Sequence, residues 1–280
     1  MIRPRASGLC FPESPRWHHN QLWFVDIFRG EVLTYDGDAL ERVARIDDDI
    51  SGLGFMPDGT PLVVSMRKKQ ILKLASDGTT AVHADLAEVA CSYLNDMLVD
   101  ADGWAFVDAI SRGEVSDQSA GSDQIIVVDP QGNWRVGAGQ LRRPNGLVLC
   151  DQGRQLIHAS TTDKNLIAWQ LNEERKMFGQ RTWAGTGEHT PDGICLDAEG
   201  AIWVGGLASG SFLRILEGGE VTDEISVAPH WATACALGGP DLRTLFMTTA
   251  QPGRLPVQKY PLENQGFLES VEVAVPAASI

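Results

Sequence analysis

The sequence contains no long hydrophobic run, no paired cysteine motif and almost no helical periodicity. No apolar stretch approaches the ~20 residues that a membrane-spanning helix needs, so we expect no membrane insertion. The five cysteines are widely spaced, odd in number and never arranged as CxxC, which favours buried thiols in a reducing compartment. The N-terminal segment lacks the apolar region of a signal peptide, and we therefore expect a cytoplasmic protein.

Positive charge is also scarce, with 23 Lys and Arg against 37 Asp and Glu and a net charge of −14. An acidic surface argues against nucleic acid or an anionic membrane as a partner, and it is compatible with cation binding. The chain has neither the GxSxG nucleophile motif nor a P-loop. These absences disfavour a serine hydrolase of the α/β type and a nucleotide-hydrolysing enzyme.

Short apolar runs separated by Gly, Asp, Asn and Pro dominate the chain and predict an all-β fold. The order strand, turn, strand recurs six times, at a spacing of about 40 to 50 residues, which is the size of a four-stranded propeller blade. The six segments are residues 14–27, 51–65, 95–108, 145–160, 192–206 and 234–249. We therefore predict that residues 1–280 form a single six-bladed β-propeller of four-stranded blades. Strands from both termini close the ring, with residues 2–9 as an outer strand beside the C-terminal strands.

Two turn signals lie only a few residues apart in the fourth repeat. Asp151-Gln152-Gly153 has a strand-like run on each side and predicts a hairpin turn, whereas Asn145-Gly146 follows a segment too rich in Gly and Pro to pair. We therefore place Asn145-Gly146 just before an innermost strand, at the end that faces the central channel. The same contrast separates the hairpin turn Pro57-Asp58-Gly59 from Pro191-Asp192-Gly193, which precedes a strand with its own later turn.

Alignment of the repeats brings the first residues of the six inner strands to one mouth of the channel. These residues are Glu13, Ser51, Asn95 with Asp96, Asn145, Asp192, and Ala234 with Cys235. Crowded carboxylates raise one another's pKa values, and a hard divalent cation removes that repulsion. Glu13, Asn145 and Asp192 offer oxygen ligands that suit Ca²⁺, Mg²⁺ or Mn²⁺, with Zn²⁺ a less natural choice. The alternative is that the Asn-Gly and Asp-Gly pairs are ordinary strand-entry turns.

Five motifs carry a resemblance to a known family: "PESPRW", "LNDMLVDADG", "RPNGLVL", "TPDGICLDAEGAIWV" and "ACALGGPDLRTLFMTT". In this order they resemble the regucalcin (senescence marker protein), gluconolactonase and luciferin-regenerating-enzyme family over nearly the whole chain. The resemblance implies a six-bladed propeller that holds one divalent metal ion in its channel, with Ca²⁺ the first expectation. It also implies lactone hydrolysis as the commonest activity.

The resemblance assigns roles to four residues. Glu13, Asn145 and Asp192 match the metal ligands, and Asp192 also matches the proposed general base. Asn95 matches a residue that contacts both the substrate and the metal-bound water. The expected reaction is attack of water on the lactone carbonyl carbon, followed by ring opening to a hydroxy acid.

The chain departs from the family pattern at two positions beside Asn95. Tyr93 occupies the place where sugar lactonases usually have a substrate-binding Arg, and Met97 replaces the Gly of their "NDG" motif. Loss of a guanidinium removes a bidentate donor, while Tyr93 adds an aromatic face and one hydroxyl. We therefore expect Asn95 and Tyr93 to position a lactone or ester that is less polar than a sugar lactone.

Two other functions remain open from the sequence. One is a non-catalytic calcium-binding regulatory protein of the regucalcin type, and the other is a different propeller esterase or phosphotriesterase. The polar segment Ser111–Asp123 is expected to be a surface loop. The sequence does not indicate an oligomeric state.

Overall fold

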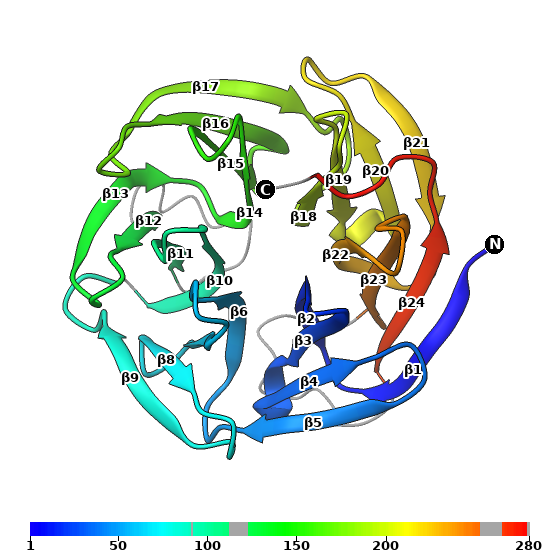
Figure 1. The fold of residues 1–280 in the computed structure, drawn as a ribbon. Helices are drawn as coiled ribbons and strands as arrows, with labels where there is room; N and C mark the ends of the chain where they lie inside the picture. Colours follow the sequence, from blue (N-terminus) through cyan, green and yellow to red (C-terminus); the bar gives the residue numbers. More distant parts are fainter. Residues whose placement is uncertain (91, 112–122, 253–264, 279–280) are drawn as a thin grey trace.

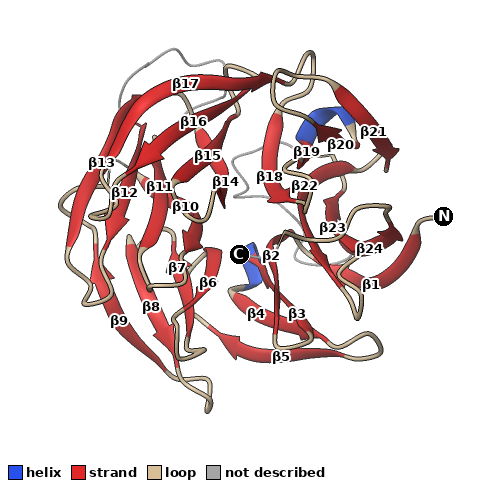
Figure 2. Ribbon diagram, turned by 45° about the horizontal axis from the view of Figure 1, so that its top comes forward, coloured by secondary structure: helices blue, strands red, loops and turns tan. Residues whose placement is uncertain are grey.

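The computed structural model describes residues 1–90, 92–111, 123–252 and 265–278. The strands form six sheets of four strands each, arranged as blades around a central axis (Figure 1). This confirms the predicted all-β, six-bladed propeller. Within the described residues the only helices are two 3₁₀ turns, η1 (Ile27–Arg29) and η2 (Leu207–Ser209), drawn blue in Figure 2. None of the helical segments in these ranges is long and apolar enough to cross a bilayer.

Five blades are each built from four consecutive antiparallel strands, and the first strand of each blade lies nearest the axis. Their inner strands are β2 (Pro12–His18), β6 (Ile50–Phe55), β10 (Tyr93–Val99), β14 (Pro144–Cys150) and β18 (Pro191–Leu196). Their second strands are β3 (Gln21–Asp26), β7 (Pro61–Ser65), β11 (Ala105–Ile110), β15 (Gln155–Ser160) and β19 (Ile202–Gly206). The outer pairs are β4 (Glu31–Tyr35) with β5 (Leu40–Arg45), β8 (Gln70–Leu74) with β9 (Thr80–Asp85), β12 (Asp123–Val128) with β13 (Trp134–Leu141), β16 (Asn165–Leu171) with β17 (Met177–Gly185), and β20 (Ser211–Ile215) with β21 (Val221–Ser226).

The sixth blade closes the ring with strands from both ends of the chain. Its inner three strands are β22 (Trp231–Gly238), β23 (Thr244–Ala250) and β24 (Gly266–Glu272), and its outer strand is β1 (Arg3–Leu9). Strand β1 pairs antiparallel with β24, with Arg3 opposite Ser270. The expectation that residues 2–9 supply this outer strand is therefore confirmed. Ring closure leaves each blade with a neighbour on both faces, so the apolar faces of the sheets are covered.

The core is made of apolar layers between neighbouring blades. The layer between the second and third blades contains Leu62 and Val64 from β7 together with Leu94 and Met97 from β10, all fully buried. Burying a side chain of this size contributes about 1.5 to 3 kcal/mol relative to leaving it in water. The inner strands are therefore fixed by packing on both faces, which makes them rigid supports for a site on the axis.

The structure corrects the placement of Asn145-Gly146. These two residues lie inside β14 and not before it, and the predicted hairpin turn at Asp151-Gln152-Gly153 joins β14 to β15. A Cβ atom built on Gly146 would lie 2.6 Å from the carbonyl oxygen of Asp192, so only glycine allows β14 and β18 to approach so closely. The Asn-Gly pair is thus a point of contact between two blades, and its glycine serves packing.

Each inner strand has a register shift where it pairs with the second strand of its blade. In the third, fourth and fifth blades, two residues of the inner strand lie opposite one residue of the second strand. The pairs are Asn95-Asp96 opposite Asp108, Asn145-Gly146 opposite Ala159, and Asp192-Gly193 opposite Gly205. A bulge of this kind redirects side chains away from the regular alternation of a strand. The sequence motifs therefore coincide with the bulges of the inner strands.

Candidate functional site

The candidate site lies where the inner strands begin, at one end of the propeller axis. There the structure brings together Asn145 and Asp192, which are 47 residues apart in the chain. The Asn145 side-chain amide donates a hydrogen bond to Asp192 Oδ1 across the boundary between the fourth and fifth blades. The Oδ1 atom of Asn145 accepts the backbone N–H of Gly146 at 3.0 Å. The two residues therefore hold each other in a fixed orientation.

Glu13 belongs to the same group of side chains. Burial raises the pKa of Glu13 well above its ordinary value, and the nearby charge of Asp192 raises it further. The backbone N–H of Ser14 donates to Glu13 Oε2 at 3.0 Å, and this hydrogen bond lowers the pKa of Glu13. Electrostatic coupling of this kind requires the two carboxyl groups to be close. Asp192 is therefore close enough to Glu13 to affect the protonation of Glu13, and Asp192 is hydrogen-bonded to Asn145.

The Asp192 carboxyl group has an unusual protonation equilibrium. Burial raises the pKa of Asp192 to about 8, and the charge of Asp96 acts in the same direction. The hydrogen bond from Asn145 and the charge of Arg143 oppose this shift. Glu13 and Asp192 therefore repel each other when both are ionised, and a divalent cation between them would remove that repulsion.

Asn95 connects this group to the third blade. Its Nδ2 atom lies 3.3 Å from Asn145 Oδ1 and 3.4 Å from Asp108 Oδ2, and it donates to both. Asp108 is fully buried on β11, and its Oδ1 atom has no hydrogen-bond partner among the described residues. Sequence reasoning selected Asn95 but missed Asp108. The sequence feature that could have identified Asp108 is that it is the single acidic residue in the otherwise apolar strand Ala105–Ile110.

The Asp96 side chain is held by the first blade. Its Oδ1 atom accepts from Arg16 Nη2 at 3.0 Å and from Ser14 Oγ at 3.1 Å. Arg16 Nη2 also donates to the backbone carbonyl of Met97 at 2.8 Å. Ser14 has a positive φ of 50°, a strained conformation for serine that turns its side chain toward Asp96. Arg16 therefore neutralises Asp96, while Glu13 and Asp192 have no such direct ion pair with it.

The two departures from the family pattern lie in different environments. Met97 is fully buried in the apolar layer between the second and third blades, so it does not change the polar surface at the mouth. A Cβ atom built on Gly52 would lie 2.7 Å from the Met97 Cβ, which shows how closely β6 and β10 pack. Tyr93 is half-buried at the start of β10 and interacts electrostatically with Arg67, a residue of the second blade. The sequence did not point to Arg67.

The remaining predicted entrance residues serve packing. Ser51, Ala234 and Cys235 are each about as buried as core residues, at 2% exposure. A Cβ atom built on Gly193 would lie 2.2 Å from the Ala234 Cβ, so this pair marks the contact between the fifth and sixth blades. Cys235 Sγ lies 3.5 Å from Cys195 Sγ of the neighbouring inner strand. The polar part of the mouth is therefore formed by the other four blades.

The donor atoms at the mouth suit a hard cation. Across the described ranges, no three side chains of the His, Cys, Asp and Glu types gather as a metal-binding group. The cluster has two carboxyl groups, from Glu13 and Asp192, and the amide oxygen of Asn145 beside them. Two carboxyl groups with raised pKa values, together with an amide oxygen, fit Ca²⁺, Mg²⁺ or Mn²⁺ better than a thiolate- or imidazole-seeking metal.

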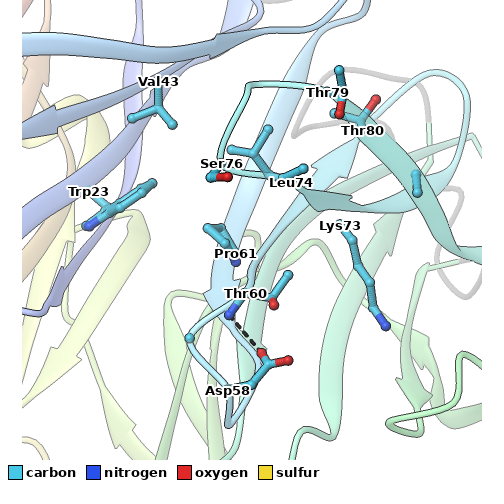
Figure 3. A pocket seen from close by; sticks show the side chains of 13 residues that line it. Trp23, Val43, Asp58, Thr60, Pro61, Lys73, Leu74, Ser76, Thr79 and Thr80 are labelled. Carbon is cyan, nitrogen blue, oxygen red and sulfur yellow. Dashed lines mark hydrogen bonds between the residues drawn. The ribbon is translucent and has the colours of Figure 1, made fainter.

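A surface cleft of about 560 Å³ lies elsewhere, between the first and second blades (Figure 3). It is lined by residues such as Trp23, Thr60 and Lys73. Its lining includes the hairpin that follows β6, which is the end of that strand away from Ser51. The cleft is therefore separate from the polar cluster at the mouth. Most of the predicted surface loop Ser111–Asp123 lies outside the described residues.

Comparison with known proteins identifies the family. Residues 11–251 match the family described as SMP-30/Gluconolactonase/LRE-like region. The chain belongs to this family. It is 26% identical over 294 aligned residues to a 6-deoxy-6-sulfogluconolactonase from Pseudomonas putida, an alignment that covers 99% of this chain and 94% of the relative. It is also 37% identical to regucalcin from Xenopus laevis over 251 residues, covering 86% of this chain and 83% of the relative.

Two solved structures share the fold. A luciferin-regenerating enzyme superposes with a TM-score of 0.85 at 18% identity, covering 100% of this chain and 97% of the other. A gluconolactonase from Xanthomonas campestris superposes with a TM-score of 0.76 at 15% identity, covering 99% and 89%. The family resemblance predicted from the five sequence motifs is therefore confirmed.

Proposed function

We propose that this protein is a divalent-metal-dependent lactonase with its active site at the mouth of the propeller. The observation that carries the proposal is the cluster of Glu13, Asn145 and Asp192, in which two carboxyl groups with raised pKa values lie beside a hydrogen-bonded amide. Without a cation, the burial of such carboxyl groups costs free energy. With a cation bound, their oxygen atoms serve as its ligands. Its relatives include a 6-deoxy-6-sulfogluconolactonase and a pentonolactonase from Haloferax volcanii, which support lactone chemistry.

The proposed metal ligands are Glu13, Asn145 and Asp192, with Ca²⁺ as the first candidate. When bound, a divalent cation would act as a Lewis acid toward the lactone carbonyl and stabilise the negative charge that develops on its oxygen. Asp192 is the proposed general base. It takes a proton from the water that attacks the carbonyl carbon, and the ring C–O bond then breaks. The leaving oxygen gains a proton, so the product is a hydroxy acid.

Asn95 and Tyr93 are the proposed substrate-binding residues. Asn95 lies within hydrogen-bond distance of Asn145, and Tyr93 stands two residues earlier in the same inner strand. The aromatic ring of Tyr93 offers an apolar face with one hydroxyl. We therefore propose a lactone or ester that carries fewer polar groups than an aldonolactone.

The proposal is tested with a panel of sugar lactones, aliphatic lactones and aryl esters, assayed with Ca²⁺, Mg²⁺ or Mn²⁺ and after treatment with EDTA. We expect metal-dependent hydrolysis by the wild-type protein and loss of at least two orders of magnitude in kcat for Asp192→Ala. Asp223→Ala, on the exposed outer strand β21, is the matched control and should retain activity. Hydrolysis that persists in Asp192→Ala would remove this residue from the mechanism.

Metal binding without turnover on any lactone or ester would instead favour the calcium-binding regulatory alternative. Calorimetry with Ca²⁺ on the wild-type protein distinguishes this case from a failure to bind metal. Turnover confined to phosphotriesters would favour the other propeller hydrolases.

A further inference from the structure

Asp108 is a buried carboxyl group that the proposed mechanism does not use. It lies on β11, the second strand of the third blade, directly opposite the bulge formed by Asn95 and Asp96. The side chain has no exposed surface. Asp108 Oδ2 accepts a hydrogen bond from Asn95 Nδ2 at 3.4 Å, and no other side chain donates to it within the described ranges.

The propeller fold does not require an acidic residue at this place. Ala159 lies opposite the corresponding bulge of the fourth blade, and Gly205 lies opposite that of the fifth blade. Both are small residues without a charge. Burying a carboxyl group costs free energy, and the hydrogen bonds from Asn95 and from the backbone N–H of Asp96 offset only part of the cost for Asp108.

The hydrogen bonds that begin at Asp192 have a fixed direction. The backbone N–H of Gly146 donates to Asn145 Oδ1, so Asn145 turns its Nδ2 toward Asp192 and its Oδ1 toward Asn95. Asn95 must then present a donor, and its Nδ2 faces Asn145 Oδ1. The same amide group donates its second hydrogen to Asp108 Oδ2. Both donors of Asn95 are therefore engaged.

A reversed Asn95 amide would place its oxygen against Asn145 Oδ1, which only accepts, and would withdraw the amide hydrogen that Asp108 Oδ2 accepts. The contact with Asp108 thus reinforces one orientation of the Asn95 side chain. In that orientation Oδ1 is the only polar atom of the Asn95 side chain outside this hydrogen-bond network. Oδ1 accepts hydrogen bonds and cannot donate them.

We propose that Asp108 is a positioning residue that fixes the Asn95 amide so that Asn95 Oδ1 accepts a hydrogen bond from a hydroxyl group of the substrate. Asn95 neighbours Asn145, a proposed ligand of the cation that receives the lactone carbonyl, so the hydroxyl recognised is the one next to that carbonyl. The preferred substrates are therefore 2-hydroxy lactones. This inference rests on the proposed lactonase function.

The electrostatic environment of Asp108 agrees with this role. Burial raises the pKa of Asp108 well above its ordinary value, and the charge of Asp96 raises it further, while the hydrogen bond from Asn95 lowers it. A neutral carboxyl group still accepts from Asn95 through one oxygen. An asparagine has the same shape and the same acceptor, so Asp108→Asn is the conservative variant.

The experiment compares α-hydroxy-γ-butyrolactone with γ-butyrolactone, two rings that differ by one hydroxyl group. We expect the wild-type protein to prefer the hydroxylated ring in kcat/KM. Asp108→Ala should reduce that preference by about 3- to 10-fold, mainly through a higher KM for the hydroxylated ring, which corresponds to one lost hydrogen bond. Asp108→Asn should keep the preference within about 2-fold of the wild-type value.

Asp26→Asn is the matched control. Asp26 is another fully buried carboxylate, and it accepts the backbone N–H groups of Cys10 and Phe11 in the first blade. Its substitution should lower the thermal stability but leave the ratio of the two kcat/KM values unchanged. Ala159 shows that the fold accepts alanine at the corresponding place, so Asp108→Ala should fold.

The outcomes separate the two proposals. If the wild-type protein hydrolyses neither lactone and no other member of the panel, the lactonase function fails and the role of Asp108 fails with it. If the wild-type protein is active and Asp108→Ala keeps the wild-type preference, only the positioning role is overturned. A proportional loss on both rings would also overturn it, because that result indicates a general structural defect.

Discussion

The side-chain amide of Asn145 donates a hydrogen bond to Asp192 across the boundary between the fourth and fifth blades. The two residues come from different repeats, and each occupies the bulge of its own inner strand. Their neighbour Glu13 comes from the first blade, on the other side of the ring closure. The site therefore depends on the complete ring, because no single blade contains it.

Removing the Asn145 amide should weaken metal binding. Asn145→Ala deletes one of three proposed ligands and leaves Asp192 without its hydrogen-bond donor. We expect at least a 10-fold loss of Ca²⁺ affinity, measured by titration calorimetry. Asn133→Ala, in an exposed turn of the third blade, removes an equivalent amide and should leave the affinity unchanged. Equal affinities for wild type and Asn145→Ala would exclude this residue as a ligand.

The stability of the metal-free protein should decrease between about pH 4 and pH 8. The pKa of Asp192 is about 8 in the folded protein, against an ordinary value of 3.8. In this window the unfolded chain releases a proton that the folded protein retains, so deprotonation favours unfolding. We expect the Tm in EDTA to fall as the pH is raised from 5 to 8.

A bound cation should reverse this dependence, because it stabilises the ionised carboxylates. Added Ca²⁺ should therefore increase the Tm more at pH 8 than at pH 5, as measured by scanning calorimetry. Asp192→Asn, which cannot ionise, should show a weaker pH dependence. A metal-free Tm that rises with pH in the wild type but not in this variant would contradict the assignment.

Substitution of Tyr93 should change the substrate preference. Tyr93→Arg introduces a guanidinium that can bind hydroxyl or carboxylate groups with two parallel hydrogen bonds. We expect an increase of about 10-fold in kcat/KM for a sugar lactone relative to an unsubstituted aliphatic lactone. Tyr93→Phe serves as the control, since it keeps the aromatic face and adds no donor. If Tyr93→Arg gains nothing on sugar lactones, Tyr93 does not determine the specificity.

The buried ion pair of Arg214 and Asp197 should be important for stability. Arg214 Nε donates to Asp197 Oδ2 at 2.7 Å, and the two side chains are 7% and 0% exposed. Arg214→Ala leaves a buried carboxylate without its partner and should reduce the free energy of unfolding by about 3 to 5 kcal/mol. Arg181→Ala breaks the exposed pair with Glu217 and should cost about 1 kcal/mol or less in a urea titration. Similar losses for both variants would contradict this difference.

Removing the closing strand should destabilise the whole ring. Deletion of residues 1–9 eliminates β1 and exposes the edge of β24. We expect a Tm lower by several degrees or more and increased aggregation, measured by calorimetry and light scattering. Deletion of residues 1–2 alone, which precede β1, is the control and should have little effect. A normal Tm after the longer deletion would show that β1 is dispensable for closure.

The fold could be predicted from the sequence because its determinants are local. Hairpin turns such as Pro57-Asp58-Gly59 and Asp151-Gln152-Gly153 recur between short apolar strands, and this pattern repeats six times. The strand at residues 2–9 followed from the requirement that a ring has no free edge. The family followed from the order of five short motifs. The cytoplasmic location, by contrast, stays a prediction.

The tertiary structure decided what those motif residues contact. Asn145-Gly146 looked like a turn, but Gly146 is needed because β14 and β18 approach too closely for any side chain. Met97 packs in an apolar layer between two blades. Asp108 accepts a hydrogen bond from Asn95, although nothing in the sequence around either residue indicates that the two meet. Local patterns determine turns and strands, whereas contacts between blades depend on the twist and packing of the closed ring. For that reason the sequence by itself determined the six blades and their candidate oxygen ligands, and only the folded ring decided which of those side chains meet.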